Sequence, residues 1–154
     1  MMPRLPNLPL HGADFLRALE MRDDHDKTSL MGESEAGNFE RVNALLKRGV
    51  SVDAIGDHHG RSALILAVEN GHDMVADLLL SAGADPNLAN ADGFTPLLYA
   101  CRNGYSSIAR RLVDAGANVN IWSDGQTAIK YALNGLHPDA GLAAFLVQRG
   151  SFEA

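Results

Sequence analysis

The sequence has few of the residues and motifs that mark enzymes and metal proteins. Its 154 residues include one cysteine, Cys101, and one tryptophan. A single cysteine excludes an intramolecular disulfide and a cysteine-rich zinc site. We find no Gly-x-Ser-x-Gly, no phosphate-binding loop and no metalloprotease histidine pair, although catalysis needs such a converging set of groups. The sequence therefore predicts neither an enzyme nor a metal site or cofactor.

Long apolar runs and an excess of positive charge are also missing. No stretch reaches the roughly 18 apolar residues that indicate a membrane span. Residues 1–10 contain three prolines and one cation, which makes a poor secretory signal. Lys and Arg total 13 against 19 Asp and Glu, for a formal charge of −6, whereas nucleic-acid binders need clustered cations. We therefore expect a cytoplasmic protein that binds neither nucleic acid nor membranes.

Threonine is scarce, and its spacing reveals an internal repeat. The only threonines are Thr28, Thr95 and Thr127, and Ser62 lies between the first two. The spacing between successive members of this set is almost constant. Two sets of glycines keep the same period: Gly37, Gly71 and Gly104, and then Gly49, Gly83, Gly116 and Gly150. A repeated unit of about 33 residues follows from this spacing.

Each unit has the local pattern of two short helices and an extended turn. In the third unit, Thr95 can cap a helix over residues 97–103, which Gly104 ends. A second helix is predicted over residues 107–115, and an extended turn then leads to Asp124-Gly125. Helices this short are marginal alone, so we expect the units to stack on their neighbours without a single globular core.

These residues resemble the ankyrin repeat. The family's Thr-Pro-Leu-His-x-Ala pattern stands here as Thr95-Pro96-Leu97-Leu98-Tyr99-Ala100, and its Leu-Leu-x-x-Gly-Ala-Asp-x-Asn pattern as residues 79–87. The resemblance implies an all-α ankyrin-type helical solenoid of antiparallel helix pairs joined by extended, β-hairpin-like turns. We place an N-terminal extension at 1–22 and the repeat domain at 23–154, with repeats at about 23–56, 57–89, 90–121 and 122–154.

The outer units depart from this pattern. Gly32 and Glu33 stand where the family prefers packed, helix-favouring residues, so the first unit is expected to act as a cap or to fray. Residues 13–22 are predicted to form a short helix over its open face. In the last unit Pro138 lies in a longer stretch between the glycines, which predicts a longer connection between its two helices.

The predicted turn tips are acidic and carry histidines. Residues 23–27 sum to a charge of −2, and Asp92 and Asp124 each add −1. We interpret the tips either as a solvated edge or as an acidic strip that steers a basic partner. His25, His58 and His59 lie at neighbouring tips, where they are either exposed turn residues or a metal- or pH-responsive cluster.

The resemblance implies non-catalytic binding of another protein through the concave face formed by the turns and first helices. The few aromatic residues on these elements either anchor a partner or pack between units. The candidate contact residues are His58, His59, Arg61, Glu69, Asn70, Phe94, Tyr99, Arg102, Asn103, Trp122 and Gln126.

Three functional hypotheses remain open from the sequence. The chain could be an inhibitor or antitoxin-like protein of a basic partner, a metal- or pH-responsive adaptor that uses the tip histidines, or a structural subunit of a larger assembly. We expect a monomer when no partner is bound. Cys101 is interpreted as a buried thiol that takes the place of a small packing residue.

Overall fold

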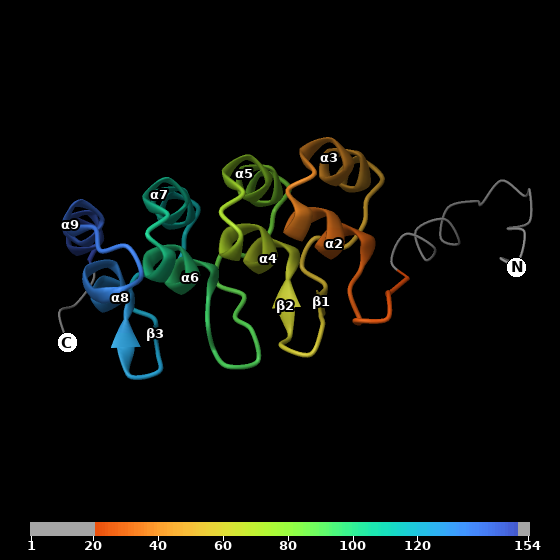
Figure 1. Ribbon diagram of the computed structural model, residues 1–154. Coiled ribbons are helices and arrows are strands. Elements are labelled where there is room, and N and C mark those ends of the chain that lie inside the picture. The colour runs from red at the N-terminus through yellow and green to blue at the C-terminus, as the bar shows by residue number, and fades with distance from the viewer. Residues whose placement is uncertain (1–20, 151–154) are drawn as a thin grey trace, which may run out of the picture.

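The computed structural model describes residues 21–150, in which helix pairs stack side by side in a row (Figure 1). The first helices of the pairs are α2 (Ser29–Ala36), α4 (Ala63–Glu69), α6 (Pro96–Asn103) and α8 (Ala128–Asn134). The second helices are α3 (Phe39–Lys47), α5 (Asp73–Ser81), α7 (Ser106–Asp114) and α9 (Ala140–Gln148). We call the four pairs repeats 1 to 4. The predicted helical solenoid is confirmed.

Each first helix begins just after its predicted capping residue. Thr28, Ser62, Thr95 and Thr127 have extended backbones, and each side-chain oxygen accepts a hydrogen bond from the backbone N–H three residues later. This bond satisfies one of the N–H groups that a helix start leaves without a partner. The regular spacing of hydroxyl residues therefore sets where each repeat begins.

Glycine at the end of a first helix also lets the next repeat approach closely. Gly37 ends α2 with a φ of +76°, a conformation that glycine adopts without a steric penalty. A Cβ on Gly37 would lie 2.6 Å from Nδ1 of His72, whose Nε2 is 2.9 Å from the carbonyl oxygen of Glu35. Gly71 and Tyr105 stand in the same relation between repeats 2 and 3.

The connection between the helices is longest in repeat 4. Residues 135–139 join α8 to α9, whereas residues 104–105 join α6 to α7, as the glycine spacing predicts. Asp139 caps α9 by accepting a hydrogen bond from the N–H of Leu142 at 3.0 Å, and the hydroxyl of Ser106 donates to the same carboxylate. This carboxylate ties the longer connection to repeat 3.

Extended turns, which we call fingers 1 to 4, precede the first helices at residues 22–28, 55–62, 88–95 and 122–127. In finger 2, β1 (Ile55–Gly56) pairs antiparallel with β2 (Arg61–Ser62). In finger 4, β3 (Trp122–Ser123) pairs with β4 (Gln126–Thr127). Asp124 and Gly125 both have positive φ, as a tight two-residue hairpin turn requires.

The buried residues lie between neighbouring repeats. Helix α2 packs on α4, α4 on α6, and α6 on α8. Ala67, Ala100 and Ala132 occupy one position on three of these helices, and all have no exposed surface. Their small side chains let adjacent helices approach closely, so the core forms as a series of contacts between neighbours.

Repeat 1 accommodates its unusual residues by pairing them. The half-buried carboxylate of Glu33 accepts hydrogen bonds from Asn38 at 2.5 Å and from Arg41 at 3.1 Å. Helix α2 is complete over eight residues, so the helix does not fray in this structure. The buried hydroxyl of Ser34 has no hydrogen-bond partner, which lowers the stability of the folded state. The helix predicted over residues 13–22 lies outside the described residues except for Met21 and Arg22.

Candidate functional site

The four fingers lie side by side and are hydrogen-bonded to one another. The N–H of Asp57 donates to the carbonyl of Asp26 at 3.2 Å, which joins fingers 1 and 2. The N–H of Ala91 donates to the carbonyl of His59 at 2.9 Å, which joins fingers 2 and 3. The hydroxyl of Ser123 reaches the carbonyl of Asp92 in finger 3 at 3.2 Å. The finger row is therefore one continuous, cross-linked edge of the molecule (Figure 1).

A side-chain oxygen near the start of each of the first three fingers braces its turn. In finger 2 the Asp57 carboxylate accepts the N–H of His59 at 2.7 Å and the Nε–H of Arg61 at 2.7 Å. Asp23 and Asn90 accept corresponding backbone hydrogen bonds in fingers 1 and 3. These local bonds hold the finger tips in one conformation.

Cations in the first two fingers reach the ends of the following first helices. The ammonium of Lys27 lies 2.5 Å from Glu35, and the guanidinium of Arg61 lies 2.5 Å from Glu69. The two pairs occupy equivalent positions in repeats 1 and 2, one period apart. In both repeats, these ion pairs neutralise the charged side chains that lie between the finger and the first helix.

Repeat 3 replaces this ion pair by an aromatic contact. Phe94 stands one period after Arg61, and Arg102 stands one period after Glu69. The guanidinium carbon of Arg102 lies 5.8 Å from the centre of the Phe94 ring, within reach of a cation–π interaction. The side chain at the end of the first helix thus changes from acidic to basic between repeats 2 and 3.

The Asp57–Arg61 contact keeps both groups charged. Burial raises the pKa of Asp57, but hydrogen bonds from the Arg61 side chain and from the N–H groups of His59 and Arg61 outweigh it, so this pKa is below its ordinary value. Burial lowers the pKa of Arg61, but Asp57 and Glu69 outweigh that effect and raise the pKa. Finger 2 therefore contains a fixed, charged network at neutral pH.

The carboxylates at the finger tips are not neutralised in the same way. Asp24, Asp92 and Asp124 are exposed, and none of the ion pairs within residues 21–150 includes them. Asp26 is paired with Arg22 at 3.5 Å. The tips thus carry negative charge outside these ion pairs, whereas Lys27 and Arg61 beneath them are paired with carboxylates.

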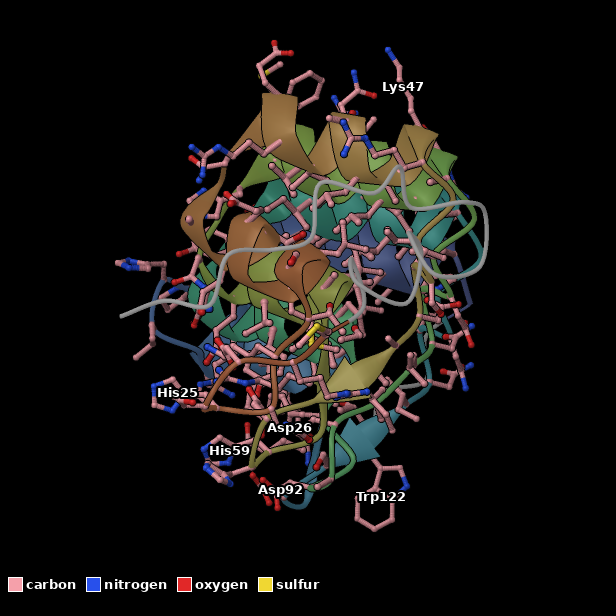
Figure 2. All side chains as sticks on the ribbon, turned by 90° about the vertical axis from the view of Figure 1, so that its right-hand side faces the viewer. His25, Asp26, Lys47, His59, Asp92 and Trp122 are labelled. Carbon is pink, nitrogen blue, oxygen red and sulfur yellow. The ribbon has the colours of Figure 1, made fainter. Side chains whose placement is uncertain are left out.

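The tip histidines are exposed and lie at one edge of the finger row. In Figure 2, which looks along the stack from repeat 1, His25 and His59 project from the same side of the finger row. His58 is also exposed. Among the described residues, no three His, Cys, Asp or Glu side chains are grouped so that they could hold a metal ion. The metal-responsive hypothesis therefore gains no support from the geometry.

Two of the aromatic candidates pack between repeats and are not open to a partner. Phe94 is 4% exposed and Tyr99 is 9% exposed. The Phe94 ring lies 5.0 Å from Tyr99 and 5.4 Å from Tyr131, both in edge-to-face geometry, which is a favourable packing arrangement. Their burial therefore favours packing over contact with a partner: Phe94 lies against Tyr131 of repeat 4, and Tyr99 lies against Phe94 and Asn90 of its own repeat.

Trp122 is the exposed aromatic candidate. Its side chain is 67% exposed on β3, and Figure 2 places it across the finger row from His25 and His59. The exposed Arg102 and the half-buried Arg61 and Glu69 lie instead between fingers and first helices. The predicted contact residues therefore do not form one patch: the histidines and Trp122 lie on opposite sides of the finger row, and Arg61, Glu69 and Arg102 lie between fingers and first helices.

The remaining polar candidates have partners within the fold. The side-chain amide of Asn70 donates to the carbonyl of Leu66 at 2.8 Å, and that of Asn103 donates to the carbonyl of Glu69 at 3.4 Å. The backbone of Gln126 pairs with that of Ser123 in the two-stranded sheet of finger 4. The asparagines therefore help to order the helix ends beside the surface.

The structure adds Lys27, Glu35 and Asn90 to the residues that shape this surface. Sequence reasoning omitted them, although Lys27 and Glu35 lie one period before Arg61 and Glu69. Comparing Arg61 and Glu69 with the equivalent positions of the first repeat identifies Lys27 and Glu35 from the sequence.

Cys101 lies in the interior of α6. It has no exposed surface, and burial raises the pKa of its thiol to about 12. A thiol in this setting is protonated and inaccessible at neutral pH, which makes it a poor nucleophile. The structure confirms the interpretation of Cys101 as a buried packing residue.

Comparison with known proteins identifies the same repeated unit. A family model of ankyrin repeats matches residues 10–90 and 75–151. An ankyrin repeat-containing protein of Treponema pallidum is 44% identical over 59 residues, which cover 38% of this chain and 20% of that protein. The inactive serine/threonine-protein kinase TEX14 of Mus musculus is 38% identical over 73 residues, covering 47% of this chain and 5% of the kinase. The 2-5A-dependent ribonuclease of Mus musculus is 37% identical over 70 residues, covering 46% of this chain and 10% of the ribonuclease.

These matches span a minor part of each relative, a fifth of its length or less. The names of the kinase and the ribonuclease therefore describe proteins that extend well beyond the matched segment. Within residues 21–150, every helix is too short or too polar to cross a membrane.

Proposed function

This chain belongs to the ankyrin repeat family, and on that premise we propose that it binds a partner protein with a basic surface and catalyses no reaction. Ankyrin repeats generally mediate protein–protein interaction. The binding surface consists of the finger row and the adjoining parts of the first helices. This proposal extends the family property to a named surface and a partner chemistry.

The exposed carboxylates at the finger tips carry this proposal. Asp24, Asp92 and Asp124 project from three different fingers and lie outside the ion pairs of the described chain. Hydrogen bonds between neighbouring fingers hold these tips in a fixed row. A row of like charges on a rigid edge attracts a basic surface over a distance and aligns it on approach.

Occlusion is the mode of action that best suits such a surface. A rigid edge without an active site acts on its partner by covering a region that the partner needs. The chain would therefore serve as an inhibitor or antitoxin-like protein of a basic protein. A partner of this kind would bind with an association rate that depends strongly on ionic strength.

The test begins with capture of the partner from the source cells and its identification by native mass spectrometry. Association of the two purified proteins is then measured by stopped flow from low to high salt. We expect the association rate to fall by about tenfold or more as salt increases. The double substitution Asp92→Asn, Asp124→Asn should slow association several-fold at low salt.

A matched control removes two negative charges from the second helices. Glu40 and Asp73 are exposed residues in the first turns of α3 and α5, so Glu40→Gln with Asp73→Asn changes net charge equally, away from the fingers. This variant should associate nearly as fast as the wild type. A rate that does not depend on salt, or equal slowing by both pairs of substitutions, would contradict the acidic finger row as the docking surface.

A further inference from the structure

Two fingers expose a large apolar side chain at the same structural position. Ile55 in β1 is 51% exposed and Trp122 in β3 is 67% exposed, and in both strands the next residue is buried. Each pairs across its finger with the residue that caps the following helix, Ser62 in finger 2 and Thr127 in finger 4. Ile55 and Trp122 are therefore equivalent residues that point outward from one side of the finger row.

Ala89 occupies this position in finger 3, between the other two. Like Ile55 and Trp122, it lies six residues after the left-handed glycine that follows the preceding second helix, and it is half-buried. We call Ile55, Ala89 and Trp122 the apolar strip. In Figure 2, which looks along the stack, Trp122 projects to the side of the finger row, at right angles to the direction of stacking. In finger 1 the strip ends at Arg22, whose guanidinium donates to the carbonyl of Ile55 at 2.9 Å.

Carboxylates lie on both sides of the apolar strip along the chain. Asp53 and Asp85 precede the strip residues of fingers 2 and 3, and they are neighbours, because the Asp53 carboxylate accepts the N–H of Asp85 at 3.0 Å. Asp92 and Asp124 follow the strip residues of fingers 3 and 4 at the tips. None of the ion pairs within residues 21–150 includes these four carboxylates. The strip is therefore bordered by negative charge toward the helices and toward the tips.

The spacing of the strip favours an α-helix as the element that covers it. Packed helices lie about 8–10 Å apart, so equivalent residues of neighbouring repeats are separated by about the same distance. Seven residues of an α-helix span about 10.5 Å and return nearly to the same face. An extended strand covers this distance in about three residues, which places successive contacts on opposite faces. A helix with apolar residues at every seventh position therefore matches the strip, whereas a strand does not.

We propose that the finger row binds a basic amphipathic helix of the partner protein. Its apolar side chains lie on the apolar strip, and its Lys and Arg side chains lie beside the carboxylates on both borders of the strip. This inference rests on the proposed function, because it names the element of the basic partner that the fingers contact. Exposed apolar rows with polar borders mark such interaction sites, and tryptophan is a common interface anchor.

Fluorescence of Trp122 tests the helix directly, because Trp122 is the only tryptophan in the chain. The probe is a synthetic peptide of about 22 residues, built from alanine, lysine and leucine and long enough to be helical. Leucine stands at every seventh position, with lysines on both sides of the leucine face. Its addition to the full chain should shift the Trp122 emission to shorter wavelength and saturate at micromolar peptide, because the helix covers the exposed indole.

A second peptide of identical composition is the matched control. Its leucines stand at every fifth position, which distributes them around the helix and leaves no apolar face. It has the same charge, so it should still be attracted to the finger tips, but it should bind about tenfold or more less tightly, because it cannot bury Ile55 and Trp122 together. Both peptides are titrated into the same wild-type protein, so the comparison does not depend on the folding of any variant.

Substitutions at the strip and at the tips should affect different rate constants for the first peptide. Ile55→Ser leaves the Trp122 reporter in place and should speed dissociation several-fold, because buried apolar contacts mainly set that rate. Asp92→Asn with Asp124→Asn should instead slow association. Met74→Ser is the control for Ile55→Ser, because Met74 is 67% exposed on α5, and it should change neither rate.

Equal binding of the two peptides, or an unchanged Trp122 emission with the first, would overturn the helix as the element that covers the strip. Either result leaves the proposed function in place if association with the captured basic partner still slows as salt increases. Conversely, association of that partner at a rate independent of salt would contradict the acidic finger row. The two proposals therefore fail in separate measurements.

Discussion

Asp57 shows how a single side chain holds a finger in place. Its carboxylate is nearly buried, with 4% of the side chain exposed, and it lies 2.7 Å from Nε of Arg61. The residue has a φ of +60°, which Asp and Asn tolerate better than most side chains. Asp57 thus supplies both the turn conformation and the acceptor that closes the turn.

Replacing Asp57 by Asn should destabilise the protein in a way that depends on pH. Asn can adopt the same backbone conformation and accept the backbone N–H groups, but it loses the charged bond to Arg61. We expect a loss of about 1–2 kcal/mol in the free energy of unfolding at pH 7. Because the pKa of Asp57 is lowered in the fold, its stabilisation is complete above the ordinary aspartate pKa. It is then lost as pH falls through the lowered pKa.

Urea unfolding of wild type and Asp57→Asn at a series of pH values measures this effect. The difference between the two proteins should be constant from about pH 5 to 7 and should narrow below about pH 4. Asp92→Asn, in the next finger, is the control and should change stability by less than about 0.5 kcal/mol. A difference that persists undiminished at pH 2 would show that the charge of Asp57 is not what stabilises finger 2.

Residue roles that depend on local sequence could be predicted, whereas burial by another repeat could not. Thr95 can be predicted as a cap, and Thr28 and Ser62 by their spacing from it, because capping requires only a hydroxyl and the first helical turn that follows it. The burial of Phe94 depends on the fourth repeat, because the ring of Tyr131 packs against it. A single sequence does not distinguish an aromatic residue on a finger that binds a partner from one that a neighbouring repeat covers.

At the scale of elements, the helix ends interlock from repeat to repeat. The His72 ring lies against Gly37, and its Nε2 contacts the carbonyl of Glu35. The regular spacing of the glycines predicts that Gly37 ends a helix, and the structure confirms this with a left-handed backbone at Gly37. The contact with His72 was not predicted, because the pattern within a repeat does not say which side chain of the next repeat fills the space above a glycine.

Gly37→Ala should therefore destabilise the protein more than Gly49→Ala. Both glycines are in repeat 1 and have similar φ values of +76° and +81°, but nothing lies within 4 Å of a Cβ on Gly49. Each substitution pays about 1 kcal/mol for the left-handed backbone. Gly37→Ala costs about 1–3 kcal/mol more, because the His72 ring must move.

A double-mutant cycle isolates the steric part of this cost. In a His72→Ala background the ring is absent, so Gly37→Ala should cost no more than Gly49→Ala. The free energies of unfolding of the four proteins in the cycle give the coupling between Gly37 and His72. If Gly37→Ala costs the same with and without His72, the close approach does not join repeats 1 and 2.

For the whole molecule, stacking implies that stability is distributed along the array. Helix α4 contacts α2 and α6, and α6 contacts α4 and α8, so inner repeats are supported from both sides. Repeat 1 has further weaknesses in Gly32 and in the unpartnered hydroxyl of buried Ser34. Local opening should therefore begin at the ends of the array and leave the inner repeats intact.

Leu30→Ala provides a direct test of this distribution. Leu30 is 2% exposed in α2, and its truncation should cost repeat 1 about 2–4 kcal/mol. Under native conditions, hydrogen exchange followed by mass spectrometry should show faster exchange in α2 and α3. Exchange in α8 and α9 should stay at the wild-type rate, because these helices contact repeat 3 and not repeat 1.

Leu97→Ala in α6 is the matched comparison. Leu97 is fully buried in repeat 3, between repeats 2 and 4, so its loss should accelerate exchange in helices on both sides. The two leucines occupy the same position after their capping threonines, and the substitution is the same. Any difference between the two exchange patterns therefore comes from the position of the repeat in the stack. Equal acceleration of α2 and α9 by Leu30→Ala would mean that the array unfolds as one cooperative unit, in which no end opens before the rest.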